Sequence, residues 1–335
     1  MRARLTPRLL VGFLLLALGG GSVVPLPAAA QPAGRAYRVG FLANALETSD
    51  GPLFAIFLDE LKRLGYVEGQ SLVIDWRSSE GDFDKLPGLA QELVQLKVDV
   101  IVASSAPPAR AAAEATKTIP IVFPVVAAAP GDKLVAGLGK PGGNLTGPAT
   151  YEPQELNTRL LRLLKEAIPK VSRIAVLMNP ANSTHLQLVA RDIPAAARPL
   201  KLTLVPSEVR SAGDLERALD AAARGADALY VLGDPLSFIH RARIVELATQ
   251  RRLPTIHTLR ANVEAGGLLS YGPKLSELYR RAATYVDKIL KGTKPADLPV
   301  DRHPKFEIVI NLRAAKALGV TVPPAVVRRA DEVIQ

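Results

Sequence analysis

The sequence predicts an α/β protein of two lobes, each a doubly wound parallel sheet, joined by a hinge of extended crossings. Three observations lead to this fold class. Short β-branched runs alternate with helical patterns along the chain. Its 335 residues suffice for about two domains, and a stretch rich in glycine and proline separates two such series. Near-continuous apolar strands alternating with helices are typical of a parallel sheet covered on both faces.

The first series begins with a βαβ unit. A strand at 38–42 is followed by apolar residues at helical spacing over 53–64 and by a strand at 72–76. The same alternation continues with helices at about 86–96 and 110–116 and with strands at 98–102 and 121–123.

A second series follows the glycine-rich stretch at 127–147. Its strands are expected at 173–178, 202–205, 228–232 and 255–256, followed by an extended segment at 266–272, an amphipathic helix at 275–290, a strand at 306–311 and a short helix to Leu318. We therefore expect an N-terminal lobe of residues 36–148 plus 272–297 and a C-terminal lobe of residues 149–271 plus 298–335.

Residues 1–30 are predicted to be a cleavable signal peptide. A basic start precedes an apolar run of ten residues, and Ala28, Ala29 and Ala30 provide the small residues that a signal peptidase requires. Ten apolar residues span only about half of a ~30 Å hydrocarbon core, which argues against a membrane helix. We expect an exported protein whose mature chain begins near Gln31.

Composition and missing motifs exclude several function classes. The chain has no cysteine, so disulfides, thiolate metal sites and a catalytic cysteine are excluded. It contains no nucleophile elbow, zinc-binding helix motif or P-loop. We expect no catalytic residue, no cofactor and no metal site. His257, which ends a predicted strand, is expected to be a solvated polar residue, with a functional role in a cleft as the alternative.

Two further patterns are set aside. The net charge is +10, but basic residues are scattered singly or in pairs, which indicates a solvated basic surface and no nucleic-acid partner. Residues 137–142 match G-x-G-x-x-G. Pro141 prevents the helix that a dinucleotide site requires, so a turn is expected there.

Polar residues follow several predicted strands. Asn44 follows the first, Ser104 and Ser105 the third, and in the second series Asn179 and Asp234 follow two more. Ligands of open α/β sheets bind beyond the carboxyl ends of strands. Helix capping is the alternative explanation for each of these residues taken singly, but several such ends facing one cleft favour a ligand.

The candidate residues indicate the chemistry of that ligand. Ser104 and Ser105 precede a predicted helix and suit a carboxylate or another anion, whereas Asp234 suits an ammonium group. The combination favours an amino acid or a related zwitterion. Tyr271, in the glycine-flanked crossing segment, completes the candidate ligand-binding set.

Several segments resemble a known family. They are 64–70 (LGYVEGQ), 140–147 (KPGGNLTG), 179–182 (NPAN), 266–273 (GGLLSYGP), 289–299 with its KPADLP run, and 314–323 (AAKALGVTVP). These segments are similar to bacterial ABC-transporter substrate-binding proteins of the tryptophan/tyrosine type. The resemblance covers essentially the whole mature chain, from about Tyr37 to its end.

The resemblance implies a type I periplasmic-binding-protein fold with three crossings that close around a small solute. It also implies a periplasmic monomer that delivers this solute to an ABC permease in the inner membrane. The chain departs from the family pattern at Ala128, where an acidic residue is common, and at Met178, where tryptophan is common. A secreted α/β hydrolase and a solute-sensing receptor subunit are the alternative functions.

Overall fold

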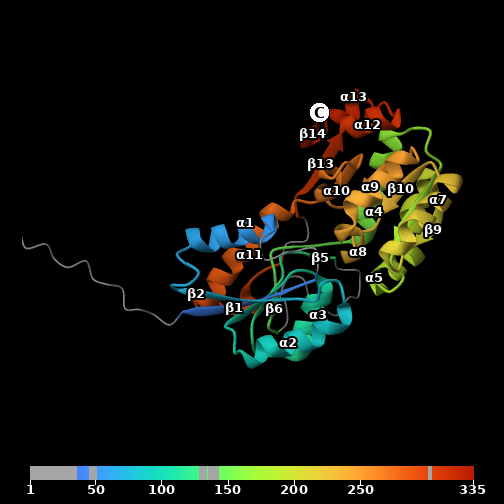
Figure 1. The fold of residues 1–335 in the computed structure, drawn as a ribbon. Coiled ribbons are helices and arrows are strands. Elements are labelled where there is room, and N and C mark those ends of the chain that lie inside the picture. Colours follow the sequence, from blue (N-terminus) through green and yellow to red (C-terminus); the bar gives the residue numbers. More distant parts are fainter. Residues whose placement is uncertain (1–35, 45–50, 128–133, 135–142, 301–303) are drawn as a thin grey trace, which may run out of the picture. The chain divides into compact units, whose positions relative to one another are not determined.

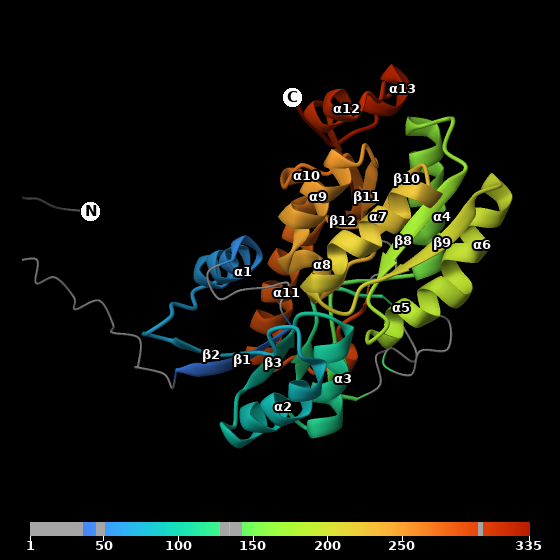
Figure 2. The ribbon, with the colours of Figure 1, turned by 45° about the vertical axis from the view of Figure 1, so that its right-hand side comes forward.

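Two open sheets organise the fold of residues 36–44, 51–127, 134, 143–300 and 304–335, which the computed structural model describes. The first has the strand order β2-β1-β3-β4-β6 and the second the order β14-β13-β12-β11-β10-β8-β9, while β5 and β7 form a separate pair. We call the parts built on these sheets the first and second lobes (Figures 1 and 2).

The first lobe contains elements from two distant parts of the sequence. They are β1 (Tyr37–Ala43), α1 (Pro52–Arg63), β2 (Leu72–Ser78), η1 (Phe83–Lys85), α2 (Leu86–Gln95), β3 (Val100–Ala103), α3 (Ala106–Ala115), β4 (Ile121–Val122), β5 (Val126–Ala127) and β6 (Leu145–Thr146), together with α11 (Leu275–Leu290) and η6 (Pro295–Asp297). Helix α11 packs along α1, so a late segment completes the early lobe.

The second lobe contains the remaining elements. They are β7 (Thr150–Tyr151), α4 (Pro153–Ala167), β8 (Arg173–Met178), α5 (Ser183–Gln187), the π-helical turn η3 (Leu188–Asp192), α6 (Ile193–Ala197), η4 (Arg198–Leu200), β9 (Thr203–Glu208), η5 (Ala212–Asp214), α7 (Leu215–Gly225), β10 (Ala228–Val231), α8 (Pro235–Ile239), α9 (Arg241–Gln250), β11 (Thr255–His257), α10 (Arg260–Glu264), β12 (Leu269–Pro273), β13 (Phe306–Asn311), α12 (Leu312–Leu318), α13 (Pro324–Val327) and β14 (Glu332–Ile334).

Each sheet is covered by apolar clusters on both faces, as the predicted fold class requires. In the first sheet, Phe41 of β1 faces one cluster, which includes residues of α1 and α11, whereas Leu42 faces the other, with residues of α2 and α3. In the second sheet, Val176 and Leu177 of β8 likewise face opposite clusters. The doubly wound α/β architecture is therefore confirmed.

One strand departs from the expected parallel arrangement. Strand β13 pairs with β12 in the antiparallel direction, whereas the other paired strands of this sheet are parallel. The reason is topological. After β12 the chain leaves for α11 of the first lobe and re-enters the second lobe beside the end at which β12 left. A strand that starts there must run antiparallel to β12.

Helix α3 starts earlier than expected, at Ala106 rather than near residue 110. Pro107 and Pro108 lie in its first turn, where a missing amide hydrogen costs nothing because no intrahelical acceptor is available. The helix therefore begins directly after Ser105, its N-cap residue.

Two glycines allow close backbone approaches where the chain passes between the lobes. A Cβ atom on Gly147 would lie 2.2 Å from the carbonyl oxygen of Phe123, and one on Gly272 would lie 1.8 Å from that of Thr258. Real Cβ atoms are not found at such distances, so both positions require glycine. The predicted limits of the lobes stay a prediction. Leu298 and Val300, which this prediction assigns to the C-terminal lobe, pack in apolar clusters of the first sheet.

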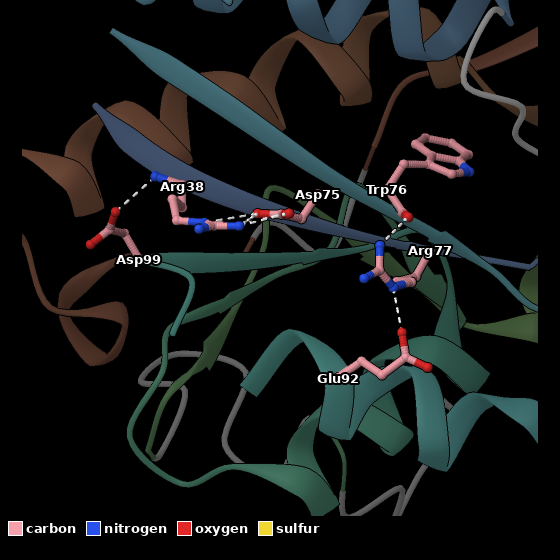
Figure 3. Close-up of polar contacts among 6 residues, drawn as sticks. All are labelled: Arg38, Asp75, Trp76, Arg77, Glu92 and Asp99. Carbon is pink, nitrogen blue, oxygen red and sulfur yellow. Dashed lines mark hydrogen bonds and ion pairs between the residues drawn. The ribbon is translucent and has the colours of Figure 1, made fainter. Parts of the chain in front are cut away.

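Polar contacts bind the outer strand of the first sheet to its neighbours (Figure 3). Arg38 of β1 forms a two-pronged ion pair with Asp75 of β2, at 2.9 and 3.1 Å. Its backbone amide also donates to Asp99 before β3, at 2.8 Å. Arg77 pairs with Glu92 of α2 at 2.6 Å. Charged side chains of this kind protect an edge strand from pairing with another chain.

Candidate ligand-binding pocket

A pocket of about 930 Å³, part of it open to solvent, lies at the carboxyl ends of strands from both sheets. Its first-lobe wall includes Asn44 after β1, Phe83 of η1, Ser104 and Ser105 after β3, and Val125. Three residues predicted from their positions after strands, Asn44, Ser104 and Ser105, thus line a single pocket.

These three residues differ in their hydrogen bonds. Asn44 Nδ2 donates to Ser105 Oγ at 3.0 Å, and Asn44 is 3% exposed. Ser104 is equally buried, and its Oγ has no hydrogen-bond partner among the described residues. Ser105 precedes α3 without capping it through its side chain. A buried hydroxyl without a partner costs free energy, and a ligand in this pocket would provide that partner.

The first turn of α3 adds amide donors and a positive partial charge. Because Pro107 and Pro108 carry no N–H, only Ser105 and Ala106 supply amide hydrogens at the start of this ten-residue helix. Ser105, Ala106 and Pro107 line the pocket. The hydroxyl of Ser104 and the start of α3 therefore suit a carboxylate.

The second-lobe wall includes residues from three strand-end loops. Asn182 and Thr184 belong to the segment after β8, Gly233 and Pro235 follow β10, and Thr258 follows β11. Of these, Asn182 belongs to a segment that carries the family resemblance, and Thr258 follows a predicted strand as Asn44 does. Strand-end position was the signal available for both.

Asn179 and Asp234 lie behind this wall rather than among the lining residues. Asp234 is 2% exposed. Its carboxylate accepts from the amide of Leu236 at 2.9 Å and from Asn182 Nδ2 at 2.9 Å, with a longer bond of 3.4 Å from Asn179 Nδ2. Asp234 thus caps α8, and Asn179 Oδ1 accepts from the amide of Ala181. Their roles toward a ligand stay predictions.

Tyr271 also lies outside the lining. Its ring stacks on Phe306 with centroids 5.2 Å apart, and its hydroxyl accepts a 3.4 Å bond from Arg159. Phe306 in turn contacts the edge of Tyr151, which does line the pocket. Tyr271 therefore supports a lining ring from behind, and direct contact with a ligand stays a prediction.

The pocket is aromatic and uncharged. Phe83, Tyr151 and Tyr279 contribute rings from η1, β7 and α11, and no acidic or basic side chain occurs among its lining residues in the described chain. The sequence did not single out these rings, because they come together only through tertiary contacts. Burial raises the pKa of the Tyr151 hydroxyl to about 12, so it stays protonated.

His257 is buried rather than solvated. It is 1% exposed, its Nε2 lies 2.9 Å from Thr255 Oγ1, and its Nδ1 lies 3.0 Å from Asn262 Nδ2. Burial lowers its pKa to about 3. The expectation of a solvated polar residue was wrong, because the chain after β11 folds back through α10 and covers the ring.

Other predicted features lie outside the described residues. These are the signal peptide at 1–30, the G-x-G-x-x-G match at 137–142 and Ala128. In the described part of the chain, no cluster of His, Asp and Glu has the arrangement of a metal site. No helix there combines the length and apolarity needed to cross a membrane.

Comparisons with known proteins agree on one family. The family model described as "ABC transporter substrate binding protein" matches residues 53–334. A tyrosine-binding protein of Clostridioides difficile (strain R20291) is 28% identical over 262 residues, which cover 78% of this chain and 75% of that protein.

Two solved structures share the fold over most of the chain. A conserved domain protein from Vibrio cholerae is 30% identical with a TM-score of 0.79. An ABC domain from Streptococcus pneumoniae in complex with L-Trp is 28% identical with a TM-score of 0.78. Each match covers 89% of this chain and 100% of the other.

Proposed function

The chain belongs to the family of ABC transporter substrate-binding proteins, and from that premise we propose that it binds an amino acid with an aromatic side chain between its lobes. Its relatives are solute-binding proteins rather than enzymes, so the hydrolase alternative is set aside. The observation that carries the proposal is the buried Ser104 hydroxyl, which has no partner among the described residues and lies beside the start of α3 in an aromatic pocket.

Each part of such a ligand has a complementary part of the pocket. The carboxylate accepts from Ser104 Oγ and from the amides that begin α3. The ammonium group faces the second-lobe wall, where Thr258 offers a hydroxyl oxygen and the negative charge of Asp234 lies behind Gly233 and Pro235. The side chain packs among Phe83, Tyr151 and Tyr279. Names of relatives support this ligand class, since one binds tyrosine and another holds L-Trp.

Calorimetric titration with L-tyrosine, L-tryptophan and two truncated analogues of tyrosine tests this assignment. Tyramine lacks the carboxylate, and 3-(4-hydroxyphenyl)propionate lacks the ammonium group. We expect both analogues to bind at least tenfold more weakly than L-tyrosine, because each leaves polar groups of the pocket unpaired. Ser104→Ala should weaken L-tyrosine but not tyramine. Equal binding of tyramine and L-tyrosine would remove the carboxylate from the proposal.

We further propose that the lobes close on the ligand about the three connections, which include residues 146–150 and 269–272. The first-lobe ends of these connections are tied together. Thr146 Oγ1 donates to the carbonyl of Leu298 at 3.0 Å, and Arg281 of α11 donates to that of Pro148 at 3.2 Å. We therefore expect the connecting segments to bend on the second-lobe side of these hydrogen bonds. Small-angle scattering should show a smaller radius of gyration with saturating L-tyrosine, and an unchanged radius contradicts closure unless the free protein is already closed.

Export, a periplasmic location, a monomeric state and delivery to an inner-membrane permease complete the proposal. N-terminal sequencing of protein from the periplasmic fraction should begin at or near Gln31. A full-length product that remains in the cytoplasm would contradict delivery to a permease.

A further inference from the structure

We propose that His185 is a positioning residue that holds together two segments of the second-lobe pocket wall, and that protonation of its ring weakens ligand binding. The part that concerns the ligand rests on the proposed function. The part that concerns the ring and its partners rests on geometry alone.

The hydrogen bonds of His185 fix its protonation state. The ring is 2% exposed, Nδ1 lies 3.0 Å from the backbone nitrogen of Asn179, and Nε2 lies 3.1 Å from the carbonyl oxygen of Gly233. A backbone N–H can only donate and a carbonyl oxygen can only accept. Nδ1 must therefore be unprotonated and Nε2 must carry the hydrogen, so the ring is neutral and in one tautomer.

The two partners belong to different segments of the pocket wall. Asn179 follows β8 and leads into Asn182 and Thr184, which line the pocket, whereas Gly233 follows β10 and lines the pocket itself. The ring bridges them, and the bonds from Asn179 and Asn182 to Asp234 add to the same connection. A displacement of the ring therefore shifts both segments of the wall.

Protonation is incompatible with this arrangement. A hydrogen on Nδ1 would point at the N–H of Asn179, which loses its acceptor and faces a second donor. Burial lowers the pKa of the ring, while the negative charge of Asp234 opposes that effect. Asp234 is the charged group that acts on the His185 ring. Asn179 and Gly233, which hydrogen-bond the ring, and Asn182, which hydrogen-bonds Asp234, are neutral.

Ligand binding and protonation are consequently linked. A ligand that contacts both wall segments favours the neutral ring, and the proton favours their separation. Below the pKa of the ring, each pH unit should weaken the ligand by up to about tenfold. Above that pKa the affinity should not depend on this residue's protonation.

The tautomer can be tested in the ligand-free protein. Nitrogen-15 NMR of the histidine rings should show His185 with an unprotonated Nδ1 and a hydrogen on Nε2 at pH 7. Exchange of the Asn179 amide hydrogen should speed up as the ring titrates in acid. A ring with a hydrogen on Nδ1, or an imidazolium at pH 7, would overturn the proposal whether or not any amino acid binds.

The linkage is tested by titrating L-tyrosine from pH 7.5 to one unit below the pKa that NMR gives for His185 in the ligand-free protein. In His185→Asn, the Oδ1 atom takes the place of Nδ1 as acceptor and cannot be protonated in this range. We expect the affinity of the unaltered protein to fall at least fivefold in acid, and that of His185→Asn to stay within twofold. His240→Asn, at the partly exposed junction of α8 and α9, is the matched control and should keep the unaltered profile.

The outcomes separate the two proposals. If L-tyrosine and L-tryptophan fail to bind at any pH, the proposed function fails, while the NMR measurements still decide the role of the ring. If the unaltered protein binds L-tyrosine equally at both pH values, or if His185→Asn shows the same fall, the linkage is wrong. If His185→Asn does not fold, the pKa of the His185 ring is measured by NMR in the unaltered protein with and without L-tyrosine. The linkage requires bound L-tyrosine to lower that pKa.

Discussion

The strand ends that face the pocket use their polar groups differently in the two lobes. After β3 in the first lobe, Ser104 Oγ is buried and has no partner among the described residues. After β8 and β10 in the second lobe, Asn179, Asn182, His185 and Asp234 bind one another or nearby backbone groups. The first lobe therefore retains a donor for a ligand, and the second presents a surface whose shape is already fixed.

This difference leads to different expectations for mutations on the two sides. A change in the second-lobe network should alter stability and binding together, because the same hydrogen bonds maintain both the fold and the wall. A change at Ser104 should alter binding alone.

The largest effect is expected for Asp234→Ala. The change removes the cap of α8 and leaves Asn182 Nδ2 and the Leu236 amide without their acceptor. Loss of a cap and of buried acceptors should lower the free energy of unfolding by about 2–4 kcal/mol, measured by urea unfolding, and should weaken L-tyrosine as well. Asp214→Ala removes a capping carboxylate that is not among the residues lining the pocket and should affect stability only. Weakened binding with unchanged stability would instead indicate direct contact between Asp234 and the ligand.

The two lobes also differ in how well their sites could be predicted from sequence. The positions of Asn44, Ser104 and Ser105 follow from strand ends that hydrophobic periodicity reveals locally. Asp234 has the same sequence signature, yet its carboxylate accepts hydrogen bonds from within its own lobe. A strand-end residue can either cap a helix or bind a ligand. Its neighbours decide between the two, and neighbours such as Asn182 are brought close only by the tertiary fold.

The fold shows the same limit. Alternating strands and helices are local patterns, and the predicted strands at 173–178 and 306–311 coincide with β8 and β13. The direction of β13 depends on where the chain returns from the first lobe, which no local pattern encodes. The rings of Phe83, Tyr151 and Tyr279 likewise come from three unrelated elements, so periodicity could identify them only as apolar positions.

A second prediction concerns acid stability and His257 in the second lobe. Its pKa is about 3 in the folded protein and about 6.5 in an unfolded chain. Below pH 6.5 the unfolded chain binds a proton that the folded protein excludes, so acidification favours unfolding. Between pH 6.5 and 4.5 this residue should remove about 2 kcal/mol from the free energy of unfolding. Urea unfolding of His257→Asn should show a loss smaller by that amount, and an equal loss in both proteins would contradict the neutral buried ring.

The third prediction concerns Ser104 in the first lobe, where binding should change without a loss of stability. Ser104→Ala removes a buried hydroxyl that has no partner in the described chain, so the free energy of unfolding should stay constant or rise slightly. The affinity for L-tyrosine should fall about tenfold or more through loss of a hydrogen bond to a carboxylate. Ser79 supplies the matched control, because its hydroxyl is also buried and unpartnered among the described residues but does not line the pocket. Ser79→Ala should leave the affinity unchanged; equal losses in both variants would show that Ser104 acts through the fold.

The smallest effect is expected at the other end of the first sheet. Arg38 lies near the start of β1, six residues before Asn44, which follows this strand, so it is about 20 Å from the pocket end of β1. Its ion pair with Asp75 is partly exposed, at 38% and 15% of the two side chains, so Asp75→Asn should cost only about 0.5–1 kcal/mol. Added salt should reduce that difference, since exposed pairs are screened. The affinity for L-tyrosine should not change. If it does, polar contacts throughout the first lobe influence the pocket, and the contrast between an available donor at Ser104 and a saturated network in the second lobe no longer explains binding.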